Sequence, residues 1–246
     1  MQQTVINSPE CILLAGARGG LGTALCGELV KRFPDAVLLT ISRSGLDRLS
    51  VTHQHLCASL EDEGAVKTVR DWLREQPIPN WVIDCCGILH WRDHSPEKNL
   101  QQCSDEALLQ SISVNVLTHL HLAQALAPLL LKRSPLVWAS LSAKVGSIED
   151  NQLGGWYSYR MSKAALNMLV RNLSIEWSRR VENCCVVAIH PGTTDTPLSK
   201  PFQSNIPDGK LYSPALSAQR IVSVLAQLQS GDNGKLLFWD GSPIPW

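Results

Sequence analysis

The sequence predicts an α/β fold: a single, doubly wound parallel β-sheet of about seven strands with helices on both faces. Short apolar runs alternate with longer segments of helical periodicity along the chain, as in successive βαβ units. The apolar runs are nearly uninterrupted, which is typical of strands buried on both faces. The 246 residues show no internal repeat and no shift in composition, so we expect one domain over residues 1–246.

The order of these segments gives each predicted element. The apolar runs predict strands at Cys11–Ala15, Ala36–Ile41, His55–Cys57, Trp81–Cys85, Leu136–Ser140, Cys184–Ile189 and Lys235–Trp239. Helical periodicity predicts a first helix that ends near Phe33 and further helices over Glu61–Arg74, Asp105–Leu131, Tyr157–Arg179 and Ser213–Gln229. Three long loops follow strands: Gly87–Ser104, Ser142–Trp156 and Pro191–Tyr212. The last holds four prolines at the end of the sheet where ligands bind, so we expect residues 191–212 to form a substrate lid.

Composition argues against several classes of function. Lys plus Arg equals Asp plus Glu, at 22 each, so the balance indicates neither a nucleic-acid partner nor a membrane surface. The N-terminal residues lack the pattern of a signal peptide, and the longest apolar stretch, Leu117–Leu131, is too short and polar to span a bilayer. Eight cysteines occur without a CxxC pair, several inside apolar strands, so we expect reduced thiols in a cytoplasmic protein.

A glycine-rich turn joins the first strand to the first helix. Gly16 permits a tight turn, Gly20 allows a pyrophosphate to approach the backbone, and Gly22 lets the helix pack on the sheet, with Leu21 between them. The N-terminus of the helix then offers N–H groups to the anion. A flexible strand–helix connection is the alternative, but the position after the first strand favours a Rossmann-like dinucleotide site.

The end of the second strand indicates which nucleotide binds. An acidic residue there would suit the ribose 2′-hydroxyl of NAD, whereas this chain has Ser42 followed by Arg43. Arginine binds phosphate through paired, charge-assisted hydrogen bonds, and Arg18 in the glycine turn is expected to reach the same phosphate. Solvated surface arginines are the alternative interpretation. We therefore expect NADP(H) to be preferred, with NAD(H) possible.

Tyr159 and Lys163 lie four residues apart on a predicted helix and so share a face. A phenol is a poor base at neutral pH, but a nearby cation lowers its pKa. General acid–base catalysis requires such tuning, although the YxxxK spacing also arises by chance. Tyr157 serves as an internal comparison, because Met161 stands four residues beyond it in place of a cation.

Together these motifs resemble the short-chain dehydrogenase/reductases. The set GARGGLG, Asn115, Ser142, Tyr159-RMSK and Pro191-Gly192 follows the order of that family from Ala15 to Pro197. The segments GSIEDNQLGGWYSYRMSKAALN and HPGTTDTPLSKPF are most similar to its C-factor-like and sniffer-like carbonyl reductase branch. The resemblance implies a single-domain oxidoreductase that moves a hydride between a nicotinamide and a carbonyl or alcohol carbon.

The resemblance also implies roles for individual residues. Tyr159 would be the catalytic acid and base, and Lys163 would hold the nicotinamide ribose and lower the pKa of Tyr159. Asn115 would hold a water in a proton relay to Lys163, and Ser142 would hydrogen-bond the substrate oxygen. The remaining implied cofactor contacts are Gly87, Pro191, Gly192, Thr194 and Thr196.

The chain departs from the family pattern in three places. Asp84-Cys85-Cys86-Gly87 stands where the family usually has Asn-Asn-Ala-Gly, so only the glycine is kept. Ser59 stands where an Asp often meets the adenine. The serine motif is loose, and the resemblance assigns Ser142 by alignment to Gly146, with Ser140 as the alternative.

Other functions are less well supported. The histidine pairs lack the further ligands of a metal site, and no GxSxG turn surrounds Ser142, so we expect neither a metal nor a serine hydrolase. Trp91, Trp156 and Trp246 are candidates to line an apolar substrate pocket. The second function considered is a dinucleotide-binding signalling or interaction protein, as the C-factor resemblance implies. The family also implies a homodimer or homotetramer.

Overall fold

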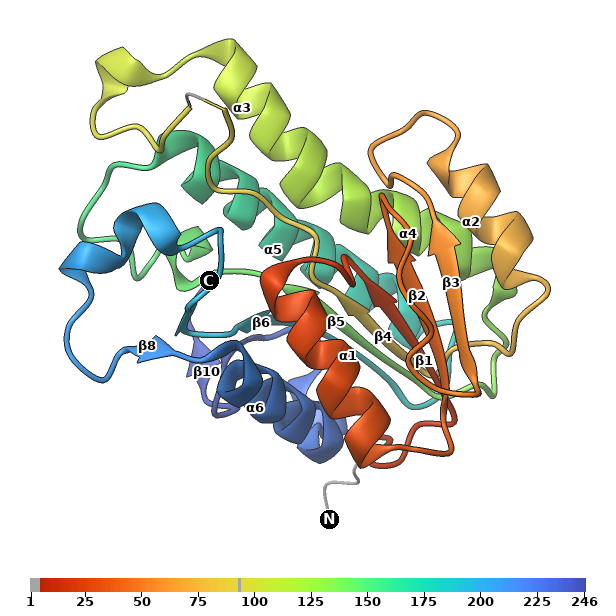
Figure 1. Cartoon of the computed structure of the whole chain (residues 1–246). Coiled ribbons are helices and arrows are strands. Elements are labelled where there is room, and N and C mark those ends of the chain that lie inside the picture. The colour runs from red at the N-terminus through yellow and green to blue at the C-terminus, as the bar shows by residue number, and fades with distance from the viewer. Residues whose placement is uncertain (1–4, 93) are drawn as a thin grey trace.

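The computed structural model describes residues 5–92 and 94–246 and has a central eight-stranded sheet in the order β10-β9-β6-β5-β4-β1-β2-β3 (Figure 1). Its strands are β1 (Cys11–Ala15), β2 (Val37–Ser42), β3 (His53–Cys57), β4 (Trp81–Asp84), β5 (Leu136–Leu141), β6 (Cys184–His190), β9 (Leu236–Phe238) and β10 (Pro243–Ile244). All neighbours are parallel except β9 and β10. The predicted doubly wound sheet is confirmed, with one strand more than the seven expected.

The strand order places the ligand-binding end of the sheet. The chain runs outward from β1 through β2 to β3, and then returns to β4 on the other side of β1. Loops that leave the carboxyl ends of β1 and β4 therefore diverge, which opens a crevice between them. The central strands β1, β4 and β5 are buried along their whole length, as their apolar sequences predict.

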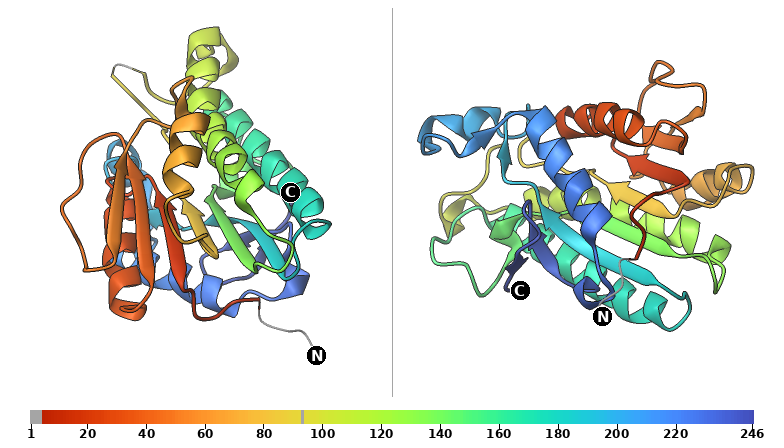
Figure 2. Two further views of the ribbon diagram at one scale, coloured as in Figure 1. Left: turned by 90° about the vertical axis from the view of Figure 1, so that its right-hand side faces the viewer. Right: turned by 90° about the horizontal axis from the view of Figure 1, so that it is seen from below.

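Helices cover both faces of the sheet (Figures 1 and 2). On one face α1 (Gly20–Arg32) packs beside α6 (Pro214–Gln227). The other face is covered by α2 (Ala65–Leu73), α4 (Thr118–Leu126) and α5 (Tyr157–Ser178), and α3 (Asp105–Ile112) packs along α5. The helices are therefore arranged as the alternating sequence pattern predicts.

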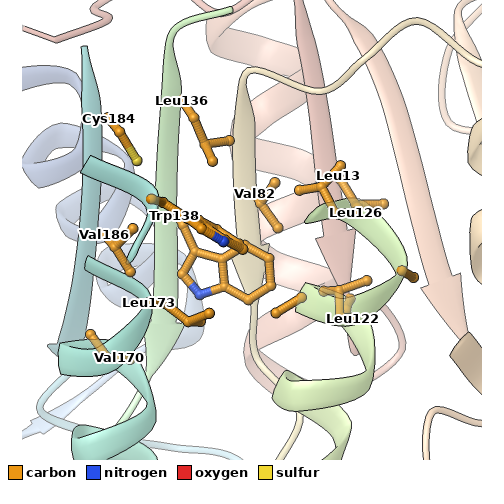
Figure 3. Close-up of a cluster of buried hydrophobic side chains, with 14 of the residues drawn as sticks. Leu13, Val82, Leu122, Leu126, Leu136, Trp138, Val170, Leu173, Cys184 and Val186 are labelled. Atoms are coloured by element: carbon orange, nitrogen blue, oxygen red, sulfur yellow. The ribbon is translucent and has the colours of Figure 1, made fainter. Parts of the chain in front are cut away.

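A tryptophan cluster fixes α5 on the sheet (Figure 3). Trp138 of β5 is fully buried and meets Trp177 of α5 edge to face, with ring centroids 5.4 Å apart. Leu122 of α4 and Leu173 of α5 belong to the same cluster. Burial of one such indole contributes roughly 4–6 kcal/mol of transfer free energy. This packing holds the helix that carries Tyr159 and Lys163.

Three elements differ from the sequence-based expectation. The single helix expected over 105–131 is interrupted by a π-helical turn, Ser113–Leu117, and ends in a 3₁₀ turn, Ala127–Leu129, where Pro128 has no N–H to continue the helix. The segment 191–212 contains two short paired strands, β7 (Thr193–Thr194) and β8 (Leu211–Tyr212), around a 3₁₀ helix, Lys200–Asn205. The strand β10 was not predicted, because two residues carry no periodicity.

Two whole-chain features complete the description. In the described ranges, no helix is long and apolar enough to cross a membrane. All eight cysteines carry free thiols. Burial raises the pKa of Cys11, Cys26, Cys184 and Cys185 to about 12, so these side chains act as apolar core residues.

Candidate active site

A cleft of about 560 Å³ opens at the carboxyl end of the sheet. Most of the predicted site residues line it: Arg18, Gly20, Leu21, Gly22, Gly87, Ser142, Tyr159, Lys163, Pro191, Gly192, Thr194 and Thr196. The predicted residues Gly16, Ser42, Arg43 and Asn115 are not among its lining residues. Residues from both halves of the sequence therefore meet where the strand order opens the crevice.

Gly16, Gly20 and Gly22 of the glycine turn have no room for a side chain. Gly16 has a φ of +76°, and a Cβ on Gly22 would lie 2.1 Å from the Gly16 carbonyl oxygen. A Cβ on Gly20 would lie 2.9 Å from Thr196, so the 191–212 segment packs directly on the turn. The first turn of α1 has no acidic residue. Its backbone N–H groups and positive dipole end can therefore bind an anion.

Two arginines lie at the segment that follows β2, of which Arg43 is the first residue. Arg18 Nη1 donates to the Gly45 carbonyl oxygen at 2.6 Å. Arg43 is largely exposed and forms an ion pair with Glu61 at 3.5 Å. The Ser42 hydroxyl donates to the Ser44 carbonyl oxygen. The acidic neighbour of Arg43 was not expected from the sequence, because Glu61 is brought there only by the loop after β3.

Tyr159 and Lys163 lie on the buried face of α5 and both line the cleft. Lys163 Nζ donates to the Leu141 carbonyl oxygen at 2.9 Å and lies 5.9 Å from the centroid of the Tyr159 ring. Burial lowers the pKa of Lys163 to about 8, and the charge of Asp84 is the main opposing influence. Burial raises the pKa of Tyr159 well above its ordinary value, so the phenol is protonated.

The raised pKa of Tyr159 has the opposite direction to the one expected from a neighbouring cation. Desolvation of the phenolate is the cause, because the ring is buried in an apolar cluster. A protonated phenol is the form that donates a proton to a carbonyl oxygen.

The two candidate serines have different surroundings. Ser142 lines the cleft, and its hydroxyl donates to Asn167 Oδ1 at 2.6 Å. Ser140 lies below the cleft, where its hydroxyl accepts from Trp138 Nε1 and contacts His119. Only Ser142 is therefore placed to reach a molecule in the cleft.

Asn115 does not line the cleft itself but holds the loop after Gly87 in place. It lies in the π-helical turn, and its Oδ1 accepts from the Ile88 N–H at 2.7 Å. Its Nδ2 donates to the Ile88 carbonyl oxygen and to Ser162 Oγ. These bonds fasten the loop after Gly87 to α5, and the local change of helical pitch turns Asn115 toward that loop.

Two buried polar residues that support the site were missed by sequence reasoning. Glu97 is buried at the start of α5, where its carboxylate accepts from the N–H and the hydroxyl of Ser158. A carboxylate there stabilises the helix end, but the distance along the chain hides the contact. Asn167 holds Ser142 and could have been found, since it continues the face of Tyr159 and Lys163 by a further four residues.

The part of the cleft beside Tyr159 is apolar and aromatic. The Trp156 ring lies 5.3 Å from Phe202 and 6.2 Å from Tyr159, measured between centroids. Leu89 and Leu198 belong to the same cluster. Of the three tryptophans proposed for a substrate pocket, only Trp156 lines the cleft. Across residues 5–92 and 94–246, no three His, Cys, Asp or Glu side chains are grouped as metal ligands would be.

Comparison with known proteins places this geometry in context. The family model described as short chain dehydrogenase matches residues 10–207. A Rhodococcus 1-hydroxy-2-glutathionyl-2-methyl-3-butene dehydrogenase is 30% identical over 96% of this chain and 99% of its own. The C-signal protein of Myxococcus xanthus is 32% identical over 56% of this chain and 78% of its own.

Two solved structures show the same fold. The carbonyl reductase Sniffer of D. melanogaster has a TM-score of 0.78 at 23% identity, over 98% of this chain and 100% of that one. An NADPH-bound carbonyl reductase from chicken fatty liver has a TM-score of 0.79 at 21% identity, over 100% of this chain and 96% of that one. The expected similarity to C-factor-like and sniffer-like proteins is thus confirmed.

Proposed function

The chain belongs to the short chain dehydrogenase family, and we propose that it is an NADP-dependent oxidoreductase acting on a carbonyl or alcohol substrate. The observation that carries the proposal is the meeting of Tyr159, Lys163 and Ser142 at one apolar cleft. A protonated phenol, a buried ammonium and a hydroxyl at the same opening are the groups that proton transfer to a substrate oxygen requires.

The cleft fits a nicotinamide dinucleotide. Gly20 and Thr196 both line the cleft at the start of α1, where a Cβ on Gly20 would fill the space between them. Arg18 contacts the segment that follows β2, and Arg43 is the first residue of that segment, which supports NADP(H) over NAD(H). The further proposed contacts are Gly16, Gly20, Leu21, Ser42, Gly87, Lys163, Pro191, Gly192, Thr194 and Thr196. When bound, the nicotinamide supplies or accepts the hydride.

The protein's own residues are assigned the proton chemistry. Tyr159 donates its hydroxyl proton to the substrate oxygen in reduction and receives a proton in oxidation. The Ser142 hydroxyl turns from Asn167 toward a carbonyl oxygen and holds it. Lys163 binds the ribose and favours the phenolate that forms. Asn115 holds a water that relays protons to Lys163, with the second lone pair of its Oδ1 as the acceptor.

The proposed substrate is a small apolar carbonyl compound or the corresponding alcohol. Trp156, Phe202 and Leu198 form the surface next to Tyr159, and such a surface favours apolar groups. Phe202 and Leu198 come from the 191–212 segment. We propose that this segment is a lid that closes over the substrate, held by the hydrogen bond from His90 Nε2 to the Pro197 carbonyl oxygen at 3.0 Å.

A substrate screen tests the proposed function. Aldehydes, ketones and diketones are offered to the purified protein, and NADPH oxidation is followed by absorbance. We expect the protein to reduce apolar carbonyl compounds. Adding a charged group to the same carbon skeleton should abolish turnover. Binding of NADPH without turnover of any compound would contradict the proposal.

The alternative function is a dinucleotide-binding signalling protein, and the match to C-signal is the observation that favours it. The enzyme is favoured because a binding protein has no need for a buried ammonium beside a phenol. The two are distinguished by Tyr159→Phe, which removes one hydroxyl. An enzyme loses turnover with this change, whereas a signalling protein that only binds the nucleotide keeps its activity.

We also propose a homodimer or homotetramer formed through α5. Met161, Met168 and Ile175 are exposed at intervals of seven residues and so share one helix face. Leu109 of the adjacent α3 is exposed beside this helix. Exposed apolar side chains gathered on neighbouring helices are typical of a subunit interface.

A further inference from the structure

A buried polar pair beneath the cleft has no part in the chemistry described above. Asp84 ends β4, His119 lies on α4, and both side chains are fully buried. Asp84 Oδ2 lies 3.4 Å from His119 Nδ1. Neither residue lines the cleft. Buried ionisable groups are costly, so their placement below the catalytic lysine requires an explanation.

Hydrogen bonds define the protonation of the imidazole. His119 Nε2 lies 3.1 Å from the Cys86 carbonyl oxygen, which can only accept, so Nε2 carries a hydrogen. Nδ1 lies 3.1 Å from Ser140 Oγ. Because Trp138 Nε1 already donates to Ser140 Oγ, the serine hydrogen is free to be donated to Nδ1. The neutral imidazole therefore has complete hydrogen bonding, in agreement with the lowering of its pKa by burial.

Because the imidazole of His119 is neutral, it is not a counter-ion for Asp84. Its Oδ1 accepts from the Cys86 N–H at 3.0 Å. Its Oδ2 has no hydrogen-bond partner in the part of the chain that the structure describes. A neutral histidine whose Nδ1 accepts from Ser140 offers Oδ2 no hydrogen. A carboxylate at this position therefore needs a balancing charge from outside the pair.

The Lys163 ammonium lies above the ends of the same two strands. Asp84 is the register partner of Ser140, and Lys163 Nζ binds the carbonyl oxygen of the next residue, Leu141. A Cβ on Gly87 would lie 3.4 Å from Nζ, so the ammonium also borders the backbone that follows Asp84. Lys163 is 3% exposed and therefore depends on nearby charges.

The ionisable groups around this ammonium are few. They are Asp84, Cys85 and Cys86 after β4, His119 on α4 and Tyr159 on α5 itself. Burial raises the pKa of both thiols well above its ordinary value, so they stay neutral at physiological pH. Asp84 is thus the only carboxylate among these groups.

We propose that Asp84 is a positioning residue that keeps Lys163 charged, while the neutral His119 shields the carboxylate from water without cancelling its charge. The proposal about charge concerns the free protein. Its effect on catalysis rests on the proposed function, in which the Lys163 ammonium favours the Tyr159 phenolate. Asp84, which stands where the family usually has an asparagine, would then stabilise the charged form of Lys163.

Chemical labelling of the lysine tests the proposal without a substrate. Cyanate carbamylates only neutral amines, and peptide mass spectrometry reports the rate at Lys163, with the exposed Lys67 as internal reference. Asp84→Asn keeps the shape of the side chain and an acceptor for Cys86 N–H. If it lowers the pKa of Lys163 by one unit from about 8, labelling at about pH 7 rises roughly fivefold. An unchanged rate at Lys163 would overturn the proposal.

A second variant separates the roles of the pair. His119→Gln removes the titratable ring and keeps a donor for the Cys86 carbonyl oxygen. We expect Lys163 labelling to stay within about twofold of wild type, because a neutral imidazole contributes no charge. A drop in labelling as large as the rise in Asp84→Asn would show that His119 is an imidazolium paired with Asp84, and the proposal would be wrong.

The catalytic consequence is read from pH profiles. Once a carbonyl substrate is known, the alkaline fall in turnover should move to lower pH in Asp84→Asn and stay in place in His119→Gln. A purely structural role of Asp84 would lower turnover equally at every pH. If the labelling results agree and no carbonyl compound is reduced, the proposed function fails while the assignment of Asp84 stands.

Discussion

Two tyrosines on the first turn of α5 have different surroundings. Tyr159 is buried in the cleft beside Lys163, whereas Tyr157 is half-buried outside it. We expect Tyr159→Phe to lower turnover by roughly 100- to 10,000-fold, since it removes only the proton donor, and to leave NADPH binding nearly intact. Tyr157→Phe should change turnover only modestly. Steady-state kinetics and nucleotide titration of both variants check this, and wild-type turnover in Tyr159→Phe would contradict the mechanism.

Cofactor preference is expected to depend on Arg43 and on its ion-pair partner. One charge-assisted contact to a 2′-phosphate contributes about 1.5–3 kcal/mol, so Arg43→Ala should weaken NADPH binding by roughly 10- to 100-fold. NADH binding should hardly change. Glu61→Gln is the matched control, because it frees the guanidinium and should tighten NADPH binding. Fluorescence titration with both nucleotides measures these effects, and equal losses for the two in Arg43→Ala would refute the assignment.

The pH dependence of turnover should follow Lys163. Burial lowers its pKa to about 8, so the amine is an ammonium below that pH and neutral above it. The raised pKa of Tyr159 keeps the phenol protonated throughout this range. Carbonyl reduction is therefore expected to fall as pH rises through about 8, when the phenolate that forms loses its cation. Turnover measured from about pH 6 to about pH 10 tests this, and a flat profile would argue against the role of Lys163.

At the scale of single elements, the 191–212 segment is the one whose motion matters for function. It packs on the glycine turn at Gly20 and is held by His90 at Pro197. We expect NADPH to slow amide hydrogen exchange across it and His90→Ala to speed that exchange, while β5 stays unchanged as a control. Exchange already as slow in the free protein as in the complex would show that the segment is not a lid.

The sequence predicted most elements because their signals are local. Uninterrupted apolar runs gave β1, β5 and β6 to within a residue, and β3 was predicted two residues short because its sequence, HQHLC, is mostly polar. The break in the helix at 113–117 could not be predicted, since a π-helical turn depends on the tertiary bonds of Asn115.

For the site as well, features encoded by neighbouring residues were predicted, whereas contacts between distant residues were not. Glycine spacing and the Tyr159–Lys163 interval are local, and the structure brings Gly20, Gly22, Tyr159 and Lys163 into one cleft. The support that Glu97 gives to α5 joins residues far apart in the chain, so only the folded structure shows it. Asp84 was recognised as a departure from the family pattern, but its neighbour His119 comes from another helix.

At the scale of the whole molecule, the proposed oligomeric state can be tested. Leu109 is 68% exposed and Met168 is 61% exposed on adjacent helices. A glutamate at either position should dissociate a dimer, because it would bury a charge in an apolar interface. Light scattering coupled to size-exclusion chromatography measures the mass. Leu131→Glu is the control, since Leu131 is similarly exposed but lies outside both helices. A wild-type monomer, or equal effects of all three variants, would rule out this interface.

The close contact between Gly20 and Thr196 also has a consequence for the time course of folding. The nucleotide cradle begins near the start of the chain and is completed by a segment that leaves the ribosome only after β6. Parallel pairing of β1 with β4 already requires a long loop to close. Refolding is therefore expected to be slow, and the competence to bind nucleotide should be its last step.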